Sequence, residues 1–250
     1  MKTKIFRIST KVILVIALAL LILSASIYFT TISRWLYYIE FPKYHLDELW
    51  FKNAGPDGTY GHLDNKQIAQ IYANVMDFLQ NQTDTFNISP VTYTKAGLLH
   101  FEDVRKLFNI CLGIFIASLV VSVLLIIWGK WRYKKNFSII SLGAYASIAL
   151  LVVFVIILII AACDFDEAFN NFHKIFFPGK DNWIFDPDQD EIIKLLPQEV
   201  FKNYAIMIFV LLATFTFGFI IAYIIQVSSR HKRNKKPQIQ SDKEFVIKIS

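Results

Sequence analysis

The sequence has few charged residues and almost no cysteine. Only 18% of its 250 residues are Asp, Glu, Lys or Arg, whereas about a quarter is usual in a soluble globular domain. This shortage argues against a soluble enzyme, a disordered chain or a nucleic-acid-binding protein. The two cysteines, Cys111 and Cys163, are too few for a disulfide framework. Both fall in or beside apolar segments, where a thiol behaves mainly as a small hydrophobic group.

Several common catalytic signatures are missing as well. The sequence contains no His-Glu-x-x-His zinc pair, no Gly-x-Ser-x-Gly turn and no phosphate-binding glycine loop. The run Asp186-x-Asp188-x-Asp190 begins like a calcium loop. However, Glu191 stands where the sharp-turn glycine belongs, and Pro197 stands where the bidentate glutamate belongs. The pattern therefore predicts a turn followed by a helix cap.

Long apolar runs dominate what is present. Four charge-free runs are each 21 to 25 residues long, and a helix needs about 20 apolar residues to cross a bilayer. They predict an all-α membrane protein with four transmembrane helices. The first run exceeds the apolar core of most signal peptides, so we expect an uncleaved anchor despite the small residues Ser24-Ala25-Ser26. The runs are Val12–Ile32, Leu107–Trp128, Ile139–Ala162 and Asn203–Val227.

The charged residues in the segments between the apolar runs predict the orientation of the protein in the membrane. The N-terminus and the loop 129–138 each carry four basic and no acidic residues, and the tail from residue 228 carries seven basic and two acidic. Because Lys and Arg mark the cytoplasmic side, both termini are expected in the cytoplasm. The segments are then a cytoplasmic start with the first span (1–32), an extracytoplasmic cap (33–106), two spans with a basic loop (107–162), an extracytoplasmic interfacial segment (163–202), and the fourth span with a basic tail (203–250).

The two outer segments contain helical patterns. Asp64 is placed to cap a helix whose apolar residues from Ile68 to Leu79 share one face. A second helix is predicted to begin near Thr94 and continue into the second span. The second outer segment has four phenylalanines at helical spacing, ended by Phe177-Pro178-Gly179, which is typical of a helix lying in the membrane interface. An ordinary interfacial anchor would explain these aromatics equally well. They are Phe165, Phe169, Phe172 and Phe176.

Two histidines stand where chemistry at a lipid head group becomes possible. His100 lies seven residues before the second apolar run, about 10 Å along a continuous helix, and shares a helical face with Asp103. An aspartate at that spacing can fix the imidazole tautomer. His173 follows Phe172 in the interfacial helix. By contrast, His45 and His62 are isolated loop histidines, which are usually solvated.

These residues carry a family resemblance. Leu99–Arg105 is similar to the His-Met-x-Asp-Val-Lys signature of the lipoprotein intramolecular transacylase (Lit) family of Gram-positive bacteria, with Phe101 in place of Met and Arg105 in place of Lys. Both replacements keep the chemical class. Residues 169–187, followed by Asp190–Pro197, resemble the second block of that family. Together with the number of spans, the resemblance covers most of the chain.

The resemblance implies an acyltransferase of the bacterial cell membrane whose active site faces the extracellular side. Its substrate would be a diacylglyceryl-modified lipoprotein, whose sn-2 acyl chain moves to the α-amine of its own N-terminal cysteine. We expect His100 and His173 to be catalytic through general acid–base chemistry, with Asp103 and Arg105 in support. No covalent intermediate, cofactor, metal or nucleic acid is expected, and membrane lipids are the remaining partners. The expected lining of the lipid pocket is Trp183, Phe165, Phe169 and Phe176.

The residues are also compatible with two other classes of protein. A non-catalytic membrane protein, such as an immunity or scaffold factor, would use the outer cap to bind a partner and would tolerate substitution of both histidines. A metal-dependent membrane hydrolase would use His100, Asp103 and His173 as ligands, since three ligands are usual in catalytic zinc sites. It would lose activity on chelation.

Overall fold

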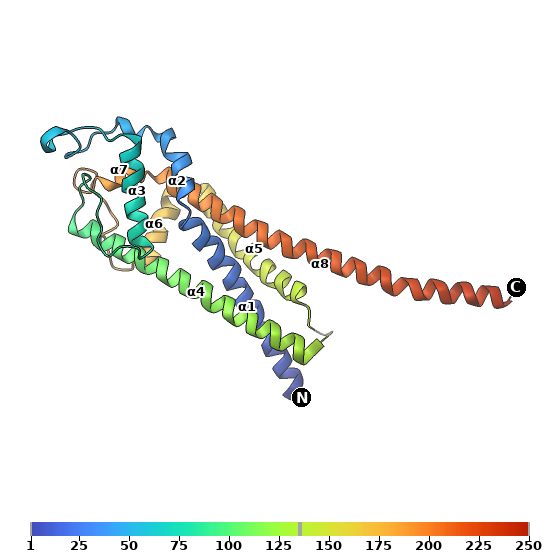
Figure 1. The fold of residues 1–250 in the computed structure, drawn as a ribbon. Coiled ribbons are helices and arrows are strands. Elements are labelled where there is room, and N and C mark those ends of the chain that lie inside the picture. The colour runs from blue at the N-terminus through green and yellow to red at the C-terminus, as the bar shows by residue number, and fades with distance from the viewer. Residues whose placement is uncertain (1, 135–136, 250) are drawn as a thin grey trace.

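The computed structural model describes residues 2–134 and 137–249, with side chains for residues 4–134 and 137–231; the expected basic loop and tail therefore lie partly outside the described residues. Within this part of the chain every regular element is helical (Figure 1). Four helices each contain one of the apolar runs and are long and apolar enough to cross a membrane. The prediction of a four-span helical membrane protein is confirmed. These helices are α1 (Lys2–Thr31), α4 (Lys95–Tyr133), α5 (Ile139–Cys163) and α8 (Gln198–Ile249).

Helix α1 packs against all three other long helices, α4, α5 and α8. Ser24, Ala25 and Ser26 are buried in this packing, because small residues let helix backbones approach closely. The hydroxyls of Ser24 and Ser26 donate to the carbonyls of Leu20 and Ile22. Their polar atoms are thus satisfied without water, as a membrane interior requires. The small residues near the end of the first span therefore belong to the bundle core.

The first outer segment folds over one end of the bundle (Figure 1). It supplies most of a hydrophobic core that also includes Ile192, Leu195 and Leu196 of the second outer segment. Its main helix begins at the predicted cap Asp64, which forms a capping box with Gln67, and the apolar face from Ile68 to Leu79 is buried as predicted. The elements of this segment are α2 (Arg34–Glu40), η1 (Phe41–Tyr44), η2 (Leu46–Glu48), η3 (Pro56–Gly58) and α3 (Asn65–Leu79).

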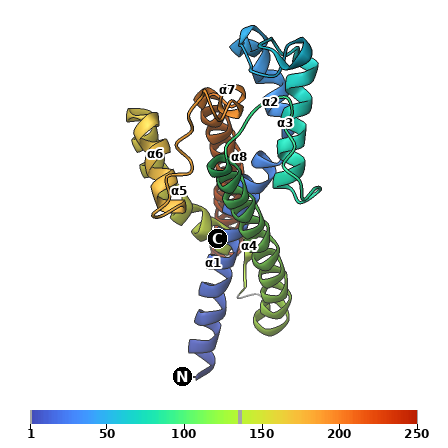
Figure 2. The same ribbon diagram turned by 90° about the vertical axis from the view of Figure 1, so that its left-hand side faces the viewer.

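The second outer segment contains α6 (Phe165–Phe176) and the single-turn α7 (Ile192–Leu195). Helix α6 ends where Phe177-Pro178-Gly179 predicts, and Gly179 has a φ of 71°, which a glycine adopts without steric cost. Figure 2 shows α3 and α6 on opposite sides of the outer end, with α7 and the start of α8 between them. The two outer segments thus face each other across the head of the bundle.

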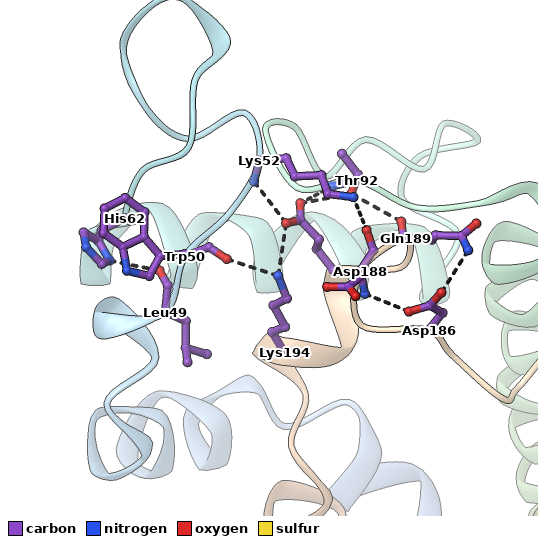
Figure 3. A network of polar contacts seen from close by, with 10 residues as sticks. Leu49, Trp50, Lys52, His62, Thr92, Asp186, Asp188, Gln189 and Lys194 are labelled. Carbon is purple, nitrogen blue, oxygen red and sulfur yellow. Dashed lines mark hydrogen bonds and ion pairs between the residues drawn. The ribbon is translucent and has the colours of Figure 1, made fainter.

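Buried Glu191 holds the second outer segment against the first. Figure 3 shows the surrounding network, with its partners Lys52, Thr92 and Lys194 labelled. Its fully buried carboxylate accepts hydrogen bonds from the Lys52 backbone N–H at 3.0 Å and the Thr92 hydroxyl at 2.9 Å. Lys194 Nζ lies 3.1 Å from the same carboxylate and also donates to the Trp50 carbonyl. Burial favours the neutral acid, but these bonds outweigh it and lower the pKa of Glu191. We call Glu191, Lys52, Thr92 and Lys194 the Glu191 clasp.

Candidate active site

Two histidines, one from each side of the outer end, meet at the head of α4. His100 lies on α4 and His173 on α6, and their ring centroids are 5.7 Å apart. Their exposed fractions are only 6% and 8%. The structure therefore brings the two predicted catalytic residues into one site.

The start of α4 fixes the position of His100. Thr94 is the N-cap, as predicted, and its hydroxyl accepts from the Gly97 N–H at 3.0 Å. The buried carboxylate of Asp190, from the second outer segment, accepts from the Thr94 N–H at 2.7 Å. A Cβ atom at residue 97 would collide with this carboxylate, so the contact requires a glycine. The second outer segment thereby sets the position of the helix that carries His100.

The ring of His173 is held by its own helix and by Trp183. Its Nδ1 lies 2.8 Å from the Phe169 carbonyl oxygen, which can only accept a hydrogen bond. A neutral His173 therefore carries its proton on Nδ1 and keeps Nε2 as the proton acceptor. Trp183 stacks on the ring at 4.8 Å, and the Trp183 indole donates to the Lys180 carbonyl at 2.9 Å. Burial lowers the pKa of His173, although the bond to Phe169 opposes this change.

The ring of His100 lies among aromatic side chains. Phe177 and Phe185 meet it edge-on at 4.9 and 5.4 Å, and its Nδ1 is buried without a hydrogen-bond partner in the described part of the protein. Burial first, and then the charges of His173 and Lys180, lower the pKa of His100 to about 4, whereas Asp103 acts in the opposite direction. Both histidines are therefore neutral at neutral pH, and a neutral imidazole can accept a proton.

Asp103 lies beside His100 but has different hydrogen-bond partners from those expected. Its carboxylate accepts from Lys180 at 2.6 Å, Lys106 at 3.0 Å and Asn182 at 3.2 Å, and no hydrogen bond to His100 is formed. Burial opposes its ionisation, but these three bonds lower the pKa of Asp103 to about 2. Charge-assisted bonds to two ammonium groups outweigh one to a neutral imidazole. Asp103 thus ties the loop before Trp183 to α4 and affects His100 through its charge.

Arg105 points away from the histidines into the first outer segment. Its guanidinium donates to the Asn81 side chain at 2.7 Å and to the Asp84 carboxylate at 3.1 Å. It also lies over the Phe78 ring at 4.7 Å. Arg105 therefore pairs with a carboxylate of the first outer segment and does not touch the histidine pair.

A cavity of about 320 Å³ lies next to the two histidines, within the usual size range of ligand sites. The predicted residues Phe169 and Trp183 line it. Phe165 and Phe176 do not; they pack on Phe169 and Phe172 at 6.2 and 4.6 Å. Sequence reasoning missed a row of apolar residues on α4, although their steps of three and four after His100 carried the signal. These residues are Phe101, Val104, Leu107, Phe108 and Cys111.

The polar atoms in the walls of the cavity are already satisfied by the protein. The Tyr72 hydroxyl donates to that of Tyr204 at 2.7 Å, because the Tyr204 hydroxyl itself donates to the Ser33 carbonyl at 3.0 Å. The Thr31 hydroxyl donates to the Ile27 carbonyl. The walls therefore offer a ligand no free hydroxyl group. The two histidines lie at the outer end of the cavity.

A pair of neutral histidines at the head of an apolar cavity, within a bundle of membrane-spanning helices, defines a site for a lipid-bearing substrate. Residues 12–201 match the family model described as lipoprotein intramolecular transacylase Lit. The chain belongs to this family. It is therefore a multi-pass membrane protein of an acyltransferase family whose substrates are lipoproteins.

Solved structures agree with this fold. The chain is similar to the membrane-integral lipoprotein intramolecular transacylase Lit from Bacillus cereus, with a TM-score of 0.76 and 21% identity over 91% of this chain and 98% of that one. A variant of the same protein with one histidine replaced by arginine matches with a TM-score of 0.72 and 18% identity, over 92% and 96% of the two chains. A comparison with curated protein sequences finds no match.

Proposed function

We propose that the protein moves the sn-2 acyl chain of an S-diacylglyceryl-cysteine lipoprotein to the α-amine of the same cysteine. The product is an N-acyl, S-monoacylglyceryl lipoprotein, known as the lyso-form. The observation that carries this proposal is the pair of neutral histidines, 5.7 Å apart, at the head of an apolar cavity. The nucleophile and the ester belong to one molecule, so the protein mainly has to hold them in reacting geometry.

In this mechanism the two histidines have different roles. An α-amine has a pKa near 8, so part of it is free to attack the ester carbonyl at neutral pH. His173 is the general base, because its Nδ1–H is bonded to Phe169 and Nε2 is left to take the proton from the attacking nitrogen. His100 donates a hydrogen bond to the developing oxyanion. The proton on His173 then passes to the departing glycerol oxygen, which leaves an amide and a free hydroxyl.

The two competing functions fit the geometry less well. A hydrolase with three metal ligands would need Asp103, whose carboxylate is bonded to two lysines and an asparagine. No group of three metal-ligating side chains gathers among the residues that were described. A non-catalytic binding protein has no need of two buried, neutral histidines in contact, since burying polar groups costs free energy.

We propose that the site faces the extracellular side of the bacterial cytoplasmic membrane. The basic N-terminal end of α1 and the last turn of α4, which carries Lys130 and Arg132, lie at the end of the bundle remote from the outer segments (Figure 1). The positive-inside rule assigns that end to the cytoplasm. The histidine pair then lies at the outer surface of the membrane, where the diacylglyceryl anchor of a mature lipoprotein is held.

Mass spectrometry of lipoprotein N-terminal peptides tests the proposed function. A host whose lipoproteins are diacylglyceryl-modified is compared with and without this gene. The expected result is N-acyl, monoacylglyceryl cysteine at unchanged total mass. An unchanged diacylglyceryl form, with the protein present in the membrane, would contradict transfer and favour a binding function.

A further inference from the structure

The cavity continues from the histidine pair along one face of α4. His100, Val104, Leu107 and Cys111 follow one another at steps of four, three and four residues and all line it, so they stand in one row. The eleven residue steps from His100 to Cys111 correspond to about 16 Å of helix. Ile27 of α1 lines the same cavity. The space is thus an elongated apolar channel that begins at the proposed reacting atoms and runs toward the membrane interior.

Beyond Cys111, α1 and α4 pack against each other and the cavity lining ends. Cys111 Sγ lies 3.6 Å from the Ser24 carbonyl oxygen. One turn further along α4, Phe115 stacks on Tyr28 at 6.1 Å and meets Phe29 edge-on at 5.5 Å. Tyr28, Phe29 and Phe115 are absent from the cavity lining. The channel therefore has a floor, and Cys111 and Ile27 are the cavity-lining residues nearest to it.

We propose that this channel holds the acyl chain to be transferred, and that Cys111 and Ile27 limit the length of chain that the enzyme accepts. The inference rests on the proposed function, because the ester carbonyl is placed at the histidines. Two features of the channel fit an acyl chain and no polar ligand. Its walls offer no unpaired hydroxyl, since Tyr72, Tyr204 and Thr31 are bonded within the protein. It also starts directly at His100.

The physical basis of length selection is the closed end. A chain that reaches the floor buries all its methylenes beside α1 and α4 when its carbonyl is at the histidines. A longer chain has to displace the packed floor or withdraw its carbonyl from the site. Each methylene gained or lost in such a pocket changes the rate by about tenfold or more. Cys111 is a small residue, so a larger side chain at this position shortens the channel without touching His100 or His173.

The test uses purified protein reconstituted in liposomes with a mixture of S-diacylglyceryl lipopeptides. These share one sn-1 chain and differ only in the length of the sn-2 chain. Mass spectrometry reads the length of each chain that appears on the amine. Cys111→Phe should reduce transfer of the longest chains by about tenfold or more while transfer of short chains continues. Cys111→Ala, which deepens the channel, should move the preference toward longer chains.

Ile110→Phe is the matched control, because Ile110 is the neighbour of Cys111 in sequence but is 56% exposed and lies outside the cavity. It should leave the length profile unchanged. The inference is overturned if Cys111→Phe and Cys111→Ala both keep the wild-type profile, or if the selected length follows the sn-1 chain in a second mixture with a constant sn-2 chain. Absence of any transfer by the wild-type protein would overturn the proposed function itself.

Discussion

The two outer segments stabilise their positions by different means. The first supplies most of a hydrophobic core, in which Tyr37, Phe51 and Ile68 are completely buried. In the second, α6 buries only His173, while Ile175 is 72% exposed. The second segment joins this core only near α7, through Ile192, Leu195 and Leu196. It is also attached through buried carboxylates: Glu191 to Lys52 and Thr92, and Asp190 to Thr94. The alignment of a site built from both segments therefore depends on these polar contacts as well as on apolar packing near α7.

This difference has a consequence for chemistry. His100 lies on a continuous helix whose start is capped, whereas His173 lies on a short helix whose other side is exposed. Catalytic groups need to be held within a fraction of an ångström of their working positions. We therefore expect changes in the polar contacts of the second segment to affect the site more than changes on the exposed side of α6.

The largest expected effect is from removing either histidine. His100→Ala and His173→Ala should each reduce acyl transfer by at least about a hundredfold, because general acid–base groups contribute this much or more. The measurement is the rate of lyso-form appearance at equal protein content in the membrane. Phe176→Ala, one turn from His173 but outside the cavity, should keep most of the activity. If His173→Ala keeps as much activity as Phe176→Ala, the second segment only covers the site and takes no part in catalysis.

Breaking the Glu191 clasp should have the next largest effect. Glu191→Ala leaves the Lys52 N–H and the Thr92 hydroxyl without their acceptor, so we expect a loss of about 1–3 kcal/mol in the free energy of unfolding. Chemical unfolding in detergent measures it. Asp181→Ala, in the same segment but exposed, should change stability by less than about 0.5 kcal/mol. Equal effects of the two substitutions would show that the clasp does not hold the segment.

Alanine substitutions at Gly97 and Gly113 on α4 are expected to change the stability of the protein in opposite directions. Replacing glycine by alanine inside a helix normally stabilises it by up to about 1 kcal/mol, and this is expected for Gly113, whose Cβ would meet nothing nearby. At Gly97 the new methyl group would meet Asp190 and Phe185. Gly97→Ala should therefore destabilise the protein by about 1–3 kcal/mol and slow transfer. Two stabilising substitutions would contradict the close packing of Asp190 on α4.

A change of pH is expected to have the smallest effect on the stability of the protein. An unfolded histidine binds a proton below a pKa of about 6.5, whereas His100 in the folded protein does so only near 4. The unfolded state therefore binds more protons between these values, and stability falls as the pH is lowered from 6.5 toward 4.5. Thermal unfolding should show a Tm that drops by a few degrees over this range. His100→Gln should reduce the drop; an unaltered pH dependence would contradict the buried neutral state.

The sequence predicts those features that depend on local pattern. The four spans, the cap of α3 at Asp64, the start of α4 at Thr94 and the end of α6 before Phe177 all follow from hydropathy, capping and turn chemistry. Helical periodicity also placed His100 and Asp103 on one face. It gave no information on which partner Asp103 would choose, because Lys180 comes from a distant part of the chain.

The sequence also could not predict the rotation of α6 about its own axis. Four phenylalanines at helical spacing define a stripe, but the stripe does not say which of its members face protein and which face lipid. Tertiary packing places Phe169 and Phe172 in the cavity lining, although Phe172 is 45% exposed, and leaves Phe165 and Phe176 outside it. Likewise, no local pattern shows that Glu191, in an acidic stretch of the second segment, is completely buried against the first.

The most direct test of the account uses the purified protein and a diacylglyceryl lipopeptide with deuterium only in its sn-2 chain, mixed with an unlabelled lipopeptide of different peptide sequence. Mass spectrometry follows where the label goes. Deuterated acyl groups are expected only on the amine of the peptide that carried them, and His100→Ala and His173→Ala should abolish this product. Label on the second peptide, or an unlabelled amide on the first, would contradict intramolecular transfer of the sn-2 chain.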